Sequence, residues 1–238
     1  MQHYTHDHYR RVLLTILCAG YDFIDFPTLS KSRAMGRHLV MRHDCDNDLI
    51  AAQDMSEIEV GYGVRATYFL MLRSALYNLL SPPNLTIARQ LVATGHHIGL
   101  HFDMYACEHL PDADVCRRIR QELDILGNEL GILVPVVSFH QPSARILENR
   151  LAMPVLNTYS RDDMQGAFYA SDSNMRFRYG EMEEWFASAP HPTIQFLIHP
   201  EWWTVEELPL ADKWRRMLSH NAGLMVESLR TRENAYAE

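Results

Sequence analysis

Residues 39–48 read LVMRHDCDND, and this stretch carries most of what the sequence says about the fold. Three apolar residues run directly into a cluster of charge that contains His43, Asp44 and Asp46, with a cysteine between the two carboxylates. Burying an unpaired carboxylate is costly, and burying two close together costs more. The stretch is therefore either a strand that ends in water or a strand whose carboxylates meet a cation.

The chain around this stretch alternates short apolar runs with longer amphipathic ones. Strands are predicted for HLVMRHD, RATYFLML, HIGLHFD, VPVVSFH, VLNTYS, AFYAS and TIQFLIH, and helices for 7–19, DLIAAQDMSEIEVGYG, NLTIARQLVATG, DADVCRRIRQELDILGNELG, 180–188 and 205–229. Asn84 is expected to cap the third of these helices. Strands that alternate with helices of this length imply parallel pairing, in an α/β barrel or a doubly wound sheet.

The charge balance points away from two classes of partner. The chain has 22 Lys and Arg against 30 Asp and Glu, a formal net charge of −8, with no Lys/Arg-rich run. Nucleic acids and anionic membranes attract basic patches, so neither is expected as the main partner. No apolar run is long enough to span a bilayer.

The N-terminal segment and the cysteines bear on the compartment. The segment reads as an amphipathic helix ended by Gly20, because His and Asp stand where a signal peptide carries positive charge. The four cysteines show no CxxC spacing, so neither a zinc knuckle nor a redox pair is predicted. We expect a cytoplasmic protein with reduced thiols. Without a repeat or linker, residues 1–238 are expected to form a single domain, of unspecified oligomeric state.

Five of the predicted strands end on an acid or a histidine. These residues are Asp44, His101, His140, Asp172 and His199. In parallel α/β folds the carboxyl ends of the strands meet at one face, where active sites assemble. Strands also become polar simply because they leave the core, but this explains poorly why all five ends are His or Asp. We interpret the five residues as one functional site.

A cation at this face would explain the carboxylates of the opening stretch. Strand side chains alternate, so Asp44 and Asp46 share a face, and His101 lies on the corresponding face of its strand. Carboxylate and imidazole suit a divalent ion such as zinc. The alternative is that Asp44 caps the following helix and Asp46 lies in solvent.

Other polar and aromatic residues are assigned to simpler roles. His3, His6, His8 and His38 are predicted to be surface residues, and His96 is expected to fix a turn. Trp202 either forms the floor of a sugar site, since aromatic faces suit pyranose rings, or packs in the core.

Four segments taken together resemble a known family. RHDCD, ATYFL, GHHIGLH and LIHP, in this order, resemble the polysaccharide deacetylase family, also called the NodB-homology domain. The resemblance is closest to the deacetylases encoded with O-antigen and other surface-polysaccharide biosynthesis genes. It covers residues from about 38 to 203, which is most of the chain.

The resemblance implies a fold and a reaction. The fold would be a distorted (β/α) barrel with about seven parallel strands, and the enzyme a metal-dependent hydrolase, with zinc the expected metal. It would remove an acetyl group from a sugar, a nucleotide-sugar or a glycan precursor. On the motif spacing, Asp44 is the catalytic base and Asp46 and His101 bind the metal, while His199 is the general acid.

The sequence departs from the family pattern at one ligand. The family has a second metal-binding histidine four residues after the first, where this chain has Tyr105. His140, in FHQPS, is the expected third ligand, with Glu108 and His109 as weaker candidates. Asp172 is assigned to positioning either the substrate or His199, and Trp202 to binding the substrate.

Two rival functions stay open, and Tyr105 favours the first of them. The first is a deacetylase-like fold that has lost its metal and binds a glycan or scaffolds a biosynthetic complex. The second is a metal hydrolase that acts on a small amide.

Overall fold

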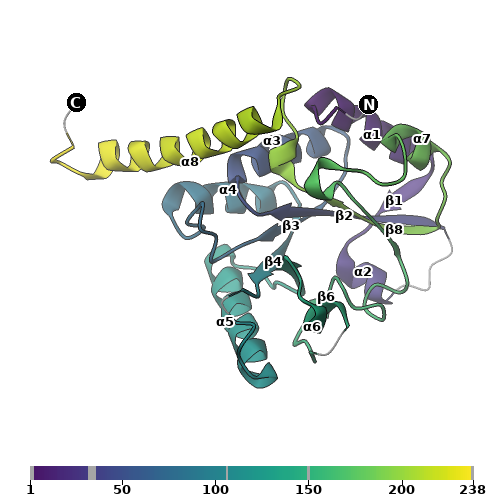
Figure 1. Cartoon of the computed structure of the whole chain (residues 1–238), viewed down its shortest axis with the longest axis horizontal. Helices are drawn as coiled ribbons and strands as arrows, with labels where there is room; N and C mark the ends of the chain where they lie inside the picture. Colours follow the sequence, from purple (N-terminus) through teal and green to yellow (C-terminus); the bar gives the residue numbers. More distant parts are fainter. Residues whose placement is uncertain (1–2, 32–35, 106, 149–150, 237–238) are drawn as a thin grey trace.

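The computed structural model describes residues 3–31, 36–105, 107–148 and 151–236 (Figure 1). Its centre is one sheet in which neighbouring strands follow the order β6-β5-β4-β3-β2-β8-β7, with β1 added beside β2. The strands are β1 (Tyr21–Phe23), β2 (Arg37–Cys45), β3 (Thr67–Leu70), β4 (His97–Asp103), β5 (Val136–His140), β6 (Leu156–Asn157), β7 (Phe168–Ser171) and β8 (Thr193–Ile198).

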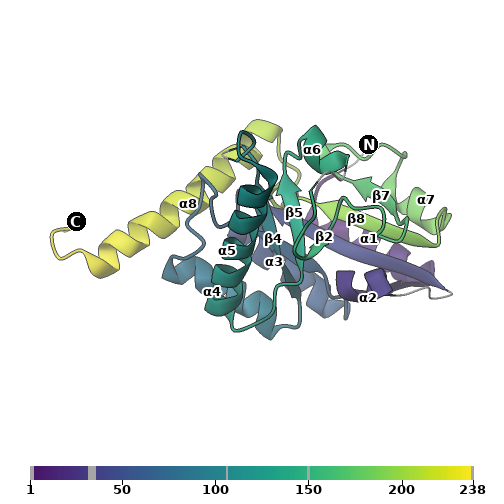
Figure 2. The same ribbon diagram turned by 90° about the horizontal axis from the view of Figure 1, so that it is seen from below.

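Helices cover the sheet (Figures 1 and 2). They are α1 (His6–Cys18), α2 (Phe26–Lys31), α3 (Leu49–Gly61), α4 (Pro82–Ala93), α5 (Asp112–Leu130), α6 (Ala144–Leu147), α7 (Met182–Ala187) and α8 (Leu210–Arg232), with 3₁₀ turns η1 (Ser173–Met175) and η2 (Pro200–Trp202). Helices α1, α3, α4 and α5 contact one another in succession along one side of the sheet. No helix in the described part of the chain is both long and apolar enough to cross a membrane.

Every strand pairing among the described residues is parallel, which confirms the predicted fold class. Seven strands form one continuous path, and within the residues described no pairing between β6 and β7 closes it into a complete barrel. Asp44 pairs with Phe69 and His101 with Ser138, so the polar strand ends lie at the same edge of neighbouring strands.

The two faces of β2 pack differently, as expected from strand alternation. On the outer face, Leu39 and Met41 join the large core beneath the helices. On the inner face, Val40 joins a smaller cluster with Phe26 and Phe69, to which α2 contributes. This small cluster fills the inside of the curved sheet. Arg42 and Asp44 follow Val40 on the same face of β2 and therefore lie inside the sheet as well, nearer its carboxyl end.

Several sequence expectations at helix ends and on the surface were wrong. Ser81, not Asn84, precedes α4, because Pro82 and Pro83 can occupy the first helical turn where backbone donors are unpaired anyway. Asp48 caps α3 by accepting from Ile50 and Ala51 backbone amides, so Asp44 is free of that role.

The N-terminal histidines also differ from expectation. His6 and His8 are buried, not exposed, because α1 lays them against the body of the protein. His8 Nε2 lies 2.8 Å from a Glu183 carboxylate oxygen, and its ring contacts Trp203. The first turn of α1 therefore buries two histidines.

Candidate active site

The carboxyl ends of β2, β4, β5 and β8 surround a cavity of about 630 Å³. Four of the five predicted strand-end residues line it: Asp44, His101, His140 and His199. Asp46 lines it as well. The walls are mainly aromatic and apolar, from Phe139, Tyr159, Tyr169, Met175, Trp202 and Trp214. The topology thus brings acids and imidazoles together in a pocket whose walls include several aromatic rings.

Asp46, His101 and His140 form a cluster that could hold a metal ion. Each offers one ligand atom, and these atoms all lie within 4.8 Å of one another. His101 Nε2 is 2.8 Å from Asp46 Oδ1, and His140 Nδ1 is 3.3 Å from Asp46 Oδ2. Two imidazoles and a carboxylate are a donor set that zinc accepts, with a fourth position left open for water or substrate.

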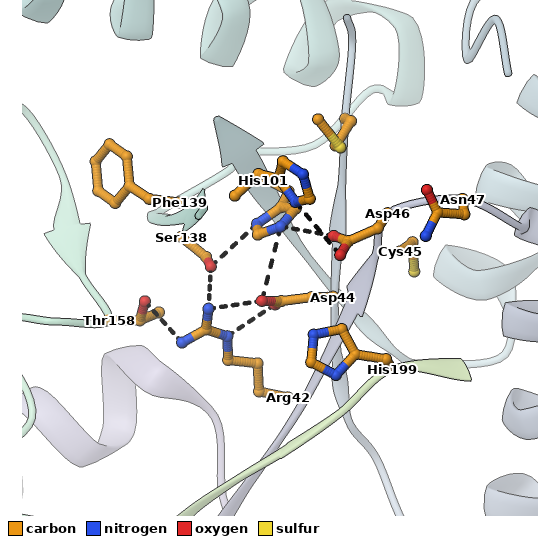
Figure 3. Close-up of polar contacts among 12 residues, drawn as sticks. Arg42, Asp44, Cys45, Asp46, Asn47, His101, Ser138, Phe139, Thr158 and His199 are labelled. Atoms are coloured by element: carbon orange, nitrogen blue, oxygen red, sulfur yellow. Dashed lines mark hydrogen bonds and ion pairs between the residues drawn. The ribbon is translucent and has the colours of Figure 1, made fainter. Parts of the chain in front are cut away.

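The surroundings of the cluster fit a bound cation. Asp46 Oδ1 is buried and has no hydrogen-bond donor among the described residues, although His101 Nε2 is close to it. His101 Nδ1 lies 3.1 Å from Ser138 Oγ, which can accept its proton and leave the Nε2 lone pair directed at Asp46 (Figure 3). Asp46 Oδ1 and His101 Nε2 thus converge on one point, as two ligand atoms around a cation would.

The protonation of Asp46 is consistent with a ligand role. Burial alone would raise the pKa of Asp46, but the imidazoles of His101 and His140 outweigh burial and hold this pKa well below its usual range. Contact with Asp46 in turn raises the pKa of His140, against the effect of its own burial. The carboxylate is therefore ionised throughout the neutral range, as a metal ligand must be.

Tyr105, the departure from the family pattern, lies outside the site. Its side chain is 91% exposed, and its backbone amide donates to Asp103 Oδ1. The described residues place His140 where the third donor is needed, from the end of the neighbouring strand β5. Glu108 is bonded through its backbone to Arg145 and is not part of the cluster.

Arg42 and Asp44 form a buried ion pair beside the cluster. Arg42 lies on β2 two residues before Asp44, so both side chains point into the curved sheet. The Arg42 Nε donates to Asp44 Oδ1 at 2.8 Å, and Nη2 donates to Asp44 Oδ2 at 2.7 Å. Burial alone would raise the pKa of Asp44, but Arg42 outweighs it and keeps this pKa lowered. Asp44 is thus ionised and held in one orientation.

Sequence reasoning missed Arg42, which makes the largest set of contacts in the site. Its Nη1 donates to Thr158 Oγ1 at 3.1 Å, and its Nη2 donates to Ser138 Oγ (Figure 3). Nη1 also donates to Gln195 Oε1 at 3.3 Å. Its guanidinium also lies 5.3 Å from the centre of the Phe69 ring. An arginine within an apolar run and on the same strand face as a carboxylate was the available signal, because such a position is buried and needs a partner.

His199 belongs to a second pair, with Asp172. His199 Nδ1 lies 2.7 Å from Asp172 Oδ1, and Trp203 Nε1 donates to Asp172 Oδ2 at 3.0 Å. Burial would lower the pKa of His199, but the charge of Asp172 outweighs it and raises this pKa to about 10. His199 is therefore protonated at neutral pH, with Nε2 left to face the cavity.

The two residues assigned to substrate occupy different places. Asp172 is fully buried behind His199, so of its two expected roles the geometry fits positioning His199 and not contact with substrate. Trp202 lines the cavity, with its ring 6.5 Å from that of His199 and edge-to-face against Trp214 at 5.2 Å. Trp203 is buried in the core instead.

Comparison with known proteins finds matches only among solved structures: no family model and no curated protein matches. The Xyl-CE4 domain of a multidomain xylanase, from the hindgut metagenome of Trinervitermes trinervoides, has 11% identity and a TM-score of 0.48 over 82% of this chain and 85% of that one. The chitin deacetylase from the fungal pathogen Colletotrichum lindemuthianum has 17% identity and a TM-score of 0.44, over 77% and 81%.

A third match is a CE4 family pseudoenzyme from Bacillus anthracis, with 13% identity and a TM-score of 0.47 over 81% of this chain and 66% of that one. These likenesses are distant, and the function is therefore inferred below from the site itself.

Replacing Arg42 with methionine would leave the Asp44 carboxylate buried without its partner. We expect the free energy of unfolding of the metal-free protein to fall by about 3–5 kcal/mol, measured by urea titration. The double variant Arg42→Met with Asp44→Leu removes the orphaned charge, so part of the loss should return. A double variant no more stable than Arg42→Met would contradict this explanation.

Metal retention provides a test of the cluster. His101→Ala and His140→Ala each remove one donor, so the metal content of protein purified without chelator should fall sharply in both. His97 is a matched control, since it lies on β4 with His101 but its side chain is 46% exposed and outside the cluster. His97→Ala should keep the native metal content by elemental analysis. Equal metal content in all three variants would overturn the ligand assignment.

Proposed function

We propose that this chain is a metal-dependent hydrolase that removes an acetyl group from a sugar. The observation that carries the proposal is the cluster of Asp46, His101 and His140 beside Asp44 and His199, all at one end of a single cavity. The cluster supplies a metal position, Asp44 an ionised carboxylate and His199 a protonated imidazole. Metal-assisted hydrolysis of an amide or ester can use all three functions.

The residues of the chain divide the proton transfers between them. When bound, a divalent ion would polarise the acetyl carbonyl and make water more acidic. Asp44 would accept the proton of the attacking water, because one lone pair on each of its oxygens stays free of Arg42. His199 would donate a proton to the departing amine or alcohol, since Asp172 keeps it charged.

The walls of the cavity support a sugar as substrate. Trp202, Trp214, Tyr159 and Tyr169 offer flat apolar surfaces of the kind that pyranose rings contact, and the roughly 630 Å³ volume suits a small number of sugar units. Zinc is the proposed metal because of the donor set of two imidazoles and a carboxylate. The motif resemblance further supports a substrate from surface-polysaccharide biosynthesis, as a free, nucleotide-linked or glycan-linked acetyl sugar.

The rival binding or scaffolding function depended on a missing metal ligand. His140 supplies a third donor atom, so the cluster no longer favours that rival. The decisive experiment is to assay the metal-loaded protein for acetate release from a panel of N- and O-acetylated sugars. Absence of release from every sugar, with metal bound at stoichiometric level, would refute the proposal, and release from small amides alone would favour the other hydrolase.

Substitutions of Asp44 and Asp46 should affect activity and metal binding differently. Asp44→Asn removes the basic oxygen but no metal ligand, so turnover should fall by about 10²–10⁴-fold while the metal stays bound. Asp46→Asn should weaken metal affinity first, and added metal should restore part of the activity. Acetate release and metal content, measured together on folded protein, distinguish the two. If both variants lose and regain metal together, Asp44 is a ligand and the base lies elsewhere.

The pH dependence of turnover should report on Asp172 and His199. The pKa of His199 is raised from 6.5 to about 10, so its acidic form persists through neutral pH and is lost only as the pH rises toward 10. Asp172→Asn removes the charge responsible, and the alkaline limit of kcat should therefore move toward neutrality. A kcat profile with an unchanged alkaline limit would show that His199 is not the acid.

A further inference from the structure

Helix α8 is long, projecting and poorly buried. It spans Leu210–Arg232, and among its residues only Lys213 and Met217 are buried. Figure 1 shows its yellow C-terminal half extending away from the body, and Figure 2 shows the same from below. Helices of this kind are stabilised mainly by packing of an apolar face, so the exposed half calls for a covering surface.

One side of α8 is anchored to the body by polar contacts. His220 Nδ1 lies 2.8 Å from Asp48 Oδ2, and Arg216 Nη2 donates to Asp54 Oδ2 at 3.1 Å. The Lys213 ammonium donates to the backbone oxygens of Tyr4 and Trp202. These contacts fix the rotation of the helix about its axis, and with it the direction of its other faces.

A second face of α8 carries an exposed apolar stripe, which we call the seam. Its residues recur at spacings of three or four: Ala211, Trp214, Leu218, Ala222, Met225 and Leu229. All are exposed, with Leu218 at 53%, Met225 at 69% and Leu229 at 42%. Spacings of three and four align side chains along one helix face and are the pattern of helix-to-helix packing.

We propose that the seam pairs with the seam of a second copy of this chain, with the two α8 helices antiparallel. A two-fold axis between Gly223 and Leu224 places Leu218 opposite Leu229 of the second copy. It also places Ala222 opposite Met225 of the second copy, so that a small residue faces a large one. Symmetry repeats both layers, which gives four matched layers along the seam.

The charged ends of the seam agree with the same register. Glu233, which follows α8, meets Arg215 of the second copy, and Arg232 meets the face of Trp214 of the second copy. A parallel pair would instead place Arg215 against itself and Ala222 against itself. Like charges would then repel and the centre of the seam would stay unfilled, so the antiparallel arrangement is favoured.

An anionic membrane suits this face less well. Lys213 is buried, Arg216 is paired with Asp54, and the whole chain has a formal net charge of −8. A lipid surface attracts helices whose basic residues flank the apolar stripe and remain free.

Since Trp214 also lines the candidate active-site cavity, pairing would bring the C-terminal end of the second helix to the mouth of that cavity.

The oligomeric state of the full chain tests the proposal. Sedimentation over a concentration series should show a species of twice the chain mass of 27.6 kDa. Ala222→Glu puts a charge at the centre of the seam and should raise the dimer dissociation constant by about tenfold or more. Gly223→Glu is the matched control, because the same side chain one residue away is turned by about 100° around the helix axis and points away from the seam. It has open space around it and should leave the dimer intact.

The orientation has its own variants. Arg215→Glu should weaken the dimer, and adding Glu233→Arg should restore it, because only the antiparallel register joins these two positions. A monomeric native chain, or equal dimerisation of the Ala222→Glu and Gly223→Glu variants, would overturn the proposal. So would a double charge reversal that fails to restore pairing. A monomer that binds vesicles of anionic phosphatidylglycerol through the seam would assign this face to a membrane instead.

Discussion

The buried ion pair between Arg42 and Asp44 is the interaction on which the candidate site depends. Both side chains are almost entirely out of solvent, so their desolvation is costly and is offset only if each polar atom is satisfied. The guanidinium donates to both oxygens of Asp44. Its remaining N–H groups donate to Thr158, Gln195 and Ser138. The orientation of the carboxylate is thereby tied to three other parts of the fold.

The position of Arg42 depends on Gly99, which leaves room for the ring that lies against the guanidinium. The Phe69 ring lies beneath the guanidinium, and it reaches that position because Gly99 on the neighbouring strand has no side chain. A Cβ on Gly99 would lie 2.3 Å from Phe69 Cε1, which is far inside contact distance. Any larger residue at 99 would displace the ring and disturb the surface on which Arg42 rests.

The outer face of β2 carries a second buried polar cluster, which explains His43. His43 Nε2 lies 2.5 Å from Glu59 Oε1, and the Tyr68 hydroxyl donates to Glu59 Oε2 at 2.7 Å. Burial would raise the pKa of Glu59, but His43 outweighs burial and lowers it. His43 therefore holds α3 to the sheet through Glu59. In the opening stretch, the outer face of the strand thus serves packing, and the inner face carries the residues of the candidate site.

The sequence predicted the strands and the faces of their side chains better than the contacts between side chains of different segments. Alternation along LVMRHDCDND was enough to put Asp44 and Asp46 on one face, and the polar strand ends were enough to place His101, His140 and His199 at one edge. The partner of Asp44 was overlooked, although an arginine within an apolar run and on the same strand face as Asp44 was a signal for it. The exposed position of Tyr105 depends on the loop after β4, for which the residues carry no periodic signal.

The meeting of His140 with Asp46 decides between the two architectures that alternating strands and helices allow. Strand β5 is three places from β2, with β4 and β3 between them. Neighbouring strands lie about 4.8 Å apart, so in a flat sheet these ends would be separated by roughly 14 Å. Their side chains nevertheless approach to 3.3 Å, and Ser138 of β5 also reaches Arg42 of β2. Only a strongly curved sheet brings inward-facing side chains across that gap, so the candidate metal-binding cluster depends on the barrel-like curvature of the sheet.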